Sequence, residues 1–149
     1  MRRAFLFAGI AAGALLVFTT AATVASPLSR NAKLARHMDK VQSVAYCRVG
    51  YEIASSFPSY ASRHAVGKAK RQLISQSDKL NDQKEVLGDL LRGAFKTEAI
   101  NLGMDGQSYD DLLSKMEAKA EVDAVISFQS VEEPNEFLNK LDEVCAPYI

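Results

Sequence analysis

Two cysteines separated by most of the chain place the strongest constraint on how this sequence folds. Cys47 lies in the most apolar segment outside the N-terminus, residues 42–54, and Cys145 lies close to the C-terminal end. In an exported chain, such a pair favours one disulfide over a metal site or a reactive thiol. We therefore expect a Cys47–Cys145 disulfide that ties the last helix to a buried central helix.

The N-terminus indicates export. Arg2 and Arg3 precede an apolar stretch, residues 4–18, and a run of small residues follows as far as Ala25. This order is typical of a secretory signal peptide. We predict a signal peptide at residues 1–25 and a single helical domain at 26–149, in the periplasm or secreted. The alternative is an uncleaved membrane anchor, because residues 4–25 carry no charge and are just long enough to cross a bilayer.

The spacing of apolar residues predicts an all-α bundle of four main helices plus a short C-terminal helix. The expected helices cover residues 29–55, 59–80 and 82–102, a fourth that starts at Ser108, and a last one that starts near Pro134. Pro58 is expected to end the first helix, because the residue before a proline disfavours the α conformation. The alternation of apolar and polar residues that is typical of strands is never sustained in this sequence. Val86 and Val144 are expected to face the core.

The charge is distributed unevenly although the chain is neutral overall. Residues 26–80 hold ten Lys and Arg against three Asp and Glu, whereas residues 81–149 hold six against fifteen. Either the two halves face each other and their charges compensate, or they form two functional surfaces of opposite sign. The densest basic cluster, Arg63, Lys68, Lys70 and Arg71, is expected to be a solvated helix face or to contact an anionic surface or another exported protein. It is too small to predict nucleic-acid binding.

No motif predicts a metal site, a cofactor or a nucleophile. Residues 101–112 resemble a calcium loop only superficially, because Gly103 and Leu112 stand where ligands are required. His37 and His64 are isolated in sequence, and we expect both at the surface. No Gly-x-Ser-x-Gly sequence and no glycine-rich phosphate loop occurs.

The central helix carries one charged pair. Arg48 and Glu52 are four residues apart, so they lie side by side, and Asp123 interrupts the apolar side of the fourth helix. We predict a buried polar cluster of Arg48, Glu52 and Asp123, because a buried charge must be paired. This cluster is expected to be structural rather than catalytic.

These observations predict a non-catalytic exported protein that acts by protein–protein interaction or as a chaperone-like, stress-related factor. One alternative is a small hydrolase in which Glu52 is the general acid, since burial favours the protonated form of a carboxyl group. The other alternative is a binder of an apolar ligand between helices. Membrane contact is expected only if the N-terminal segment is retained.

Overall fold

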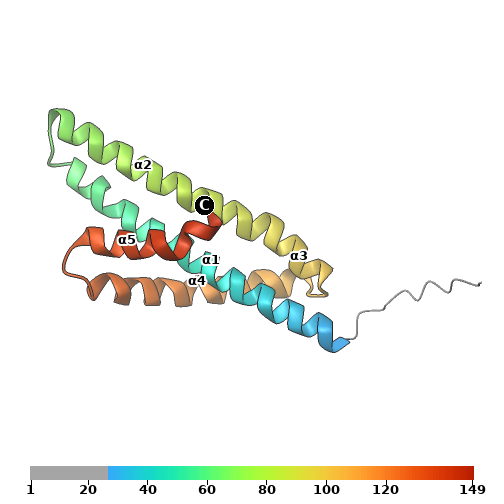
Figure 1. Ribbon diagram of the computed structural model, residues 1–149. Helices are drawn as coiled ribbons and strands as arrows, with labels where there is room; N and C mark the ends of the chain where they lie inside the picture. The colour runs from blue at the N-terminus through green and yellow to red at the C-terminus, as the bar shows by residue number, and fades with distance from the viewer. Residues whose placement is uncertain (1–26) are drawn as a thin grey trace, which may run out of the picture.

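A computed structural model describes residues 27–149 of the chain, and the predicted signal peptide at 1–25 lies outside the described residues. Every described element is a helix (Figure 1). The elements are α1 (Pro27–Ser62), α2 (Gly67–Leu90), a π-helical turn η1 (Leu91–Phe95), α3 (Lys96–Asn101), α4 (Gly106–Gln129), α5 (Pro134–Cys145) and a short 3-10 turn η2 (Ala146–Tyr148). The predicted all-α architecture with one disulfide is confirmed.

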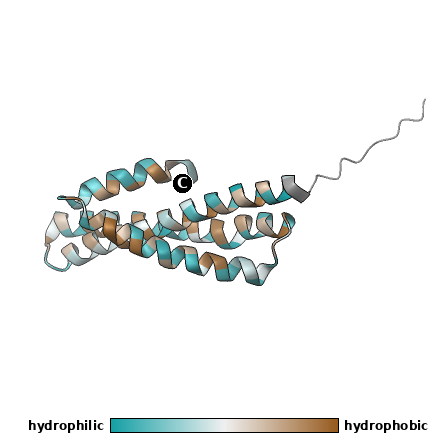
Figure 2. Cartoon of the chain, turned by 90° about the horizontal axis from the view of Figure 1, so that it is seen from below, coloured by the Kyte–Doolittle hydropathy of each residue, from teal (hydrophilic) through white to brown (hydrophobic). Residues whose placement is uncertain are grey.

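The core is built around α1, as expected from its apolar segment. Val41, Val44 and Tyr51 on α1 are fully buried. They belong to one core cluster with Leu87 of α2, Leu91 of η1 and Tyr109 of α4. Apolar positions recur turn by turn along the helices (Figure 2), which is the pattern that buries one face of each helix. Each large side chain removed from water contributes about 1.5–3 kcal/mol.

The prediction that Pro58 ends the first helix is wrong. α1 continues through Pro58 to Ser62. Proline removes one backbone N–H and so weakens the helix locally, but tertiary contacts hold this segment. The Ser77 hydroxyl donates to the carbonyl oxygen of Ser55 at 3.1 Å, and the ring of Phe57 stacks on Phe128 with centroids 4.5 Å apart. Packing therefore offsets the cost of the proline.

The predicted break between residues 80 and 82 is also wrong. α2, η1 and α3 follow one another directly from Gly67 to Asn101, and the turn expected at residues 56–58 lies at residues 63–66. Gly67 has a φ of +60°, which glycine adopts without strain. This glycine marks the turn between α1 and α2.

The fourth helix begins two residues earlier than the sequence predicted. α4 begins at Gly106 rather than Ser108, and Asp105 is the N-cap: its carboxylate accepts a hydrogen bond from the Ser108 amide at 2.9 Å. The hydrogen bonds from Ser108 lower the pKa of Asp105. Gly103 follows the end of the preceding helix with a φ of +97°, a left-handed conformation that glycine adopts at helix ends.

Candidate functional site

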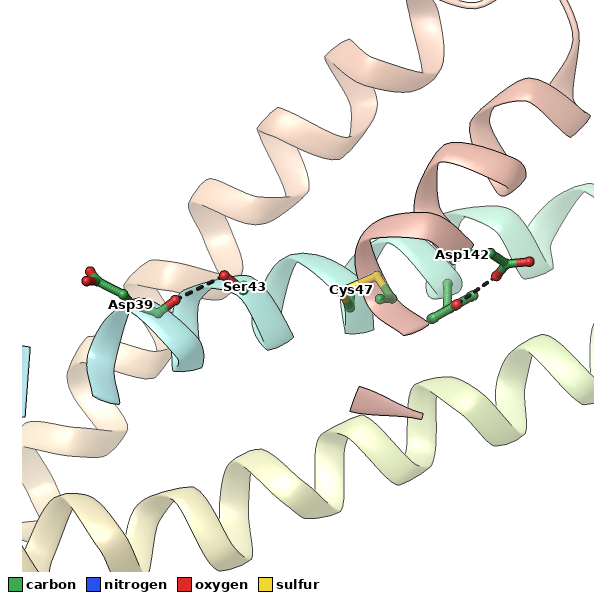
Figure 3. The surroundings of a disulfide bond; sticks show 6 residues. Asp39, Ser43, Cys47 and Asp142 are labelled. Carbon is green, nitrogen blue, oxygen red and sulfur yellow. Dashed lines mark hydrogen bonds between the residues drawn. A yellow bond between two sulfur atoms is a disulfide. The ribbon is translucent and has the colours of Figure 1, made fainter. Parts of the chain in front are cut away.

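The disulfide joins the middle of α1 to the end of α5 (Figure 3). Both cysteines are fully buried. One turn away, the Tyr51 hydroxyl donates to the Asp142 carboxylate at 2.7 Å, and burial, with the nearby Asp142, raises the pKa of Tyr51. Gly50 gives α5 room to approach, because a Cβ there would collide with Leu141. The end of α5 is thus fixed firmly against α1.

A hollow of about 340 Å³ lies beside this junction, between α1, α4 and α5. Tyr46 and Val144, the residues that precede the two cysteines, both line it. Its other lining residues come from α1 and α4: Asp39, Gln42, Ser43, Met116, Ala120 and Asp123. Asp39 and Ser43 lie on α1 at four-residue steps before Cys47 (Figure 3). The volume lies within the range of about 300–1,000 Å³ that is usual for binding sites.

The hollow is lined by both apolar and negatively charged side chains. Tyr46, Met116 and Val144 supply apolar surface, and among residues 27–149 the only charged ones that line it are Asp39 and Asp123. Both are exposed, and within residues 27–149 neither is in an ion pair of 4 Å or less. An unpaired carboxylate attracts a cation. The arrangement therefore fits a positively charged group with an apolar body.

The predicted cluster of Arg48, Glu52 and Asp123 forms only in part. Arg48 is 19% exposed and lies 2.9 Å from the Glu117 carboxylate and 3.9 Å from that of Glu52. Asp123 is exposed and faces the hollow instead. The six residue steps from Glu117 to Asp123 turn the helix by about 600°, which leaves the two side chains about 120° apart. Glu117, rather than the predicted Asp123, is therefore the residue of α4 that pairs with Arg48.

The side chain of Glu52 is 55% exposed. The hydrolase alternative required it to be buried, so that premise is not met. A second hollow, between α1, α2 and the start of α5, is largely apolar but measures only about 180 Å³. That is below the usual size of a ligand site.

The prediction that His37 lies at the surface is wrong. The residue is 3% exposed, and its ring packs edge-on against Phe95 with centroids 5.3 Å apart. Nε2 lies 2.8 Å from the carbonyl oxygen of Phe95, and Nδ1 lies 3.3 Å from the Glu98 carboxylate. His37 lies three residues after Leu34 and four before Val41, so helical spacing places it on the same apolar face of α1. This spacing was the signal in the sequence that could have predicted its burial. His64 is exposed, as expected.

Val86 and Val144, both predicted to face the core, are 55% and 53% exposed. On α5 the buried residues Phe137, Leu141 and Cys145 follow four-residue steps, and Val144 falls on the flank that faces the hollow. The contribution of Val144 to a site could not be recognised from sequence, because the opposite wall belongs to distant helices.

Within residues 27–149 no group of three or more His, Cys, Asp or Glu side chains is arranged to hold a metal ion. No helix in this range is both long enough and apolar enough to cross a membrane. The disulfide fits an extracellular or periplasmic location. No family model, curated protein or solved structure matches the chain.

Proposed function

We propose that this chain is an exported, non-catalytic protein that binds a cationic, partly apolar segment of another protein in the hollow between α1, α4 and α5. The observation that carries the proposal is that two carboxylates without an ion-pair partner, Asp39 and Asp123, line the same hollow as apolar side chains. A Lys or Arg side chain matches this surface, because its hydrocarbon stem packs on apolar groups while its charged end meets a carboxylate.

The apolar surface of the hollow and its two carboxylates both contribute to the expected affinity. An exposed ion pair contributes only about 0.2–1 kcal/mol, so the two aspartates together add at most about 2 kcal/mol. Apolar surface contributes about 25 cal/mol for each Å² removed from water. The carboxylates therefore select a positively charged partner, and Tyr46, Met116 and Val144 hold it.

A charge placed in the hollow tests the proposal. The probe is a short amphipathic peptide of leucine and lysine, and its affinity for the chain beginning at Ser26 is measured by fluorescence anisotropy. Val144→Lys puts a cation at the hollow without disturbing the core, since Val144 is 53% exposed. We expect binding at least about ten-fold weaker, because a like charge must now be accommodated. Asp39→Asn with Asp123→Asn should weaken binding and reduce its salt dependence.

The matched control is Val122→Lys. Val122 is 58% exposed on α4 and does not line the hollow, so this variant changes the net charge equally and should bind as the unmodified chain does. Equal losses from Val144→Lys and Val122→Lys would contradict the proposal. Equally tight binding of a peptide with glutamate in place of lysine would contradict it as well.

A further inference from the structure

The turn between α1 and α2 is a cationic tip at one end of the molecule (Figure 1). No Asp or Glu occurs from residue 53 to residue 77, whereas this stretch holds four cations: Arg63, Lys68, Lys70 and Arg71. All four are exposed, and within residues 27–149 none takes part in an ion pair of 4 Å or less. The nearest acidic residues in sequence are Glu52 and Asp78.

The same tip exposes apolar side chains. Val66 is 83% exposed, the highest value among the large hydrophobic residues described, and Tyr60 is 65% exposed. Tyr60 stacks edge-on against His64, with ring centroids 5.5 Å apart. Tyrosine is common where proteins meet the surface of a bilayer, because its ring is apolar and its hydroxyl is polar.

The Val66 side chain is neither buried nor a helix cap. It is the N-cap residue of α2, and it makes no capping hydrogen bond. Serine, threonine, aspartate or asparagine would stabilise the helix there. A valine at this position neither caps the helix nor packs in the core, which is the kind of local conflict found at functional sites.

We propose that the α1–α2 turn docks on an anionic lipid bilayer. The four cations match the negative headgroups, and Val66 and Tyr60 enter the interfacial region between them. A soluble polyanion would satisfy the cations but would leave Val66 in water, so the exposed apolar side chains favour a bilayer. This contact is separate from the hollow and needs no membrane-spanning segment.

Co-sedimentation with vesicles tests the proposal. The chain beginning at Ser26, which contains every helix described, is mixed with vesicles of phosphatidylglycerol and phosphatidylcholine in equal parts, and with phosphatidylcholine alone. We expect binding to the anionic vesicles only. Lys68→Gln with Arg71→Gln should weaken it about 25-fold, because each cation near a charged bilayer contributes about five-fold in affinity.

The control for charge is Lys33→Gln with Lys40→Gln. These residues are exposed near the other end of α1, so the net charge changes equally and binding should stay within about two-fold. Equal weakening by the two pairs of substitutions would overturn the proposal, because it would show attraction to the whole protein rather than to the tip.

Val66→Ser tests the insertion of an apolar side chain. We expect vesicle binding roughly five- to ten-fold weaker, while the thermal midpoint stays the same or rises because serine caps α2. Val122→Ser, on the outer side of α4, should leave vesicle binding unchanged. If Val66→Ser has no effect and polyphosphate binds as tightly as the vesicles do, the surface recognises a polyanion and not a bilayer.

Discussion

Removing the Cys47–Cys145 disulfide is expected to lower the free energy of unfolding by about 4–5 kcal/mol. The bridge spans 98 residues of sequence. When the chain unfolds, the bridge still restricts it, and the entropy lost in closing a loop of about 100 residues corresponds to about 4.7 kcal/mol at 25 °C. Domains are typically stable by about 5–15 kcal/mol, so this single bond is a large part of the total.

The folded state should change much less than the unfolded state. Phe137 and Leu141 of α5 are each 2% exposed, and Tyr51 donates to Asp142. Burial of the two apolar side chains contributes about 3–6 kcal/mol, which keeps α5 on α1 after reduction. We therefore expect a reduced protein whose helical circular dichroism at low denaturant is unchanged, provided its remaining stability is positive.

Guanidinium unfolding of three samples measures the effect: the oxidised chain, the chemically reduced chain, and the Cys47→Ala, Cys145→Ala variant. The denaturant slope should increase when the bridge is absent, since the unfolded chain then exposes more surface. The reduced chain retains both sulfur atoms, so it separates the effect of the bond from that of a packing defect. Equal unfolding free energies in the oxidised and reduced chains, within about 1 kcal/mol, would refute the loop-closure argument.

Two further predictions concern tyrosines and glycines. Burial, with Asp110 and Glu117 nearby, raises the pKa of Tyr109 to about 12, and the pKa of Tyr51 is raised still further. The pKa of tyrosine in the unfolded chain is about 10. The stability that the buried, neutral tyrosines contribute is therefore complete below about pH 10 and is lost as the pH rises through 12. Helical circular dichroism that persists after the tyrosines ionise would argue against this prediction. In thermal melts, Gly103→Ala should lower the free energy of unfolding by at least about 1 kcal/mol, because φ is +97° and a Cβ would meet Arg30. Gly93 has open space around it and no positive φ, so Gly93→Ala should leave the stability unchanged or raise it slightly.

The fold class was predictable from local pattern, and the disulfide from the number of cysteines. Apolar residues at three- and four-residue steps specify helices, and two cysteines allow only one pairing. The helix boundaries were less predictable. Pro58 was expected to stop α1, but Ser77 and Phe128, both distant in sequence, contact Ser55 and Phe57 in the turn just before it, and the helix continues. A rule about neighbouring residues cannot include contacts of that kind.

The candidate site was harder to predict, because its walls belong to separate helices. Arg48 was recognised from its spacing to Glu52, yet its closest partner is Glu117, which lies 69 residues away. No sequence pattern marks Asp39 as part of a site, and the apolar spacing of the last helix assigned Val144 to the core rather than to the hollow. Their significance comes from the way α1 and α5 are fixed side by side at the disulfide.

The two proposed sites are opposite in charge and far apart. The hollow lies near residues 39–46 of α1 and the cationic tip begins near Ser62, which places them roughly 30 Å apart along the helix. This separation exceeds three Debye lengths at physiological salt, where one is about 8 Å. Charge at one site is therefore screened from the other. A bilayer that attracts the tip leaves the hollow open to a positively charged partner, so the vesicle and peptide experiments test independent surfaces.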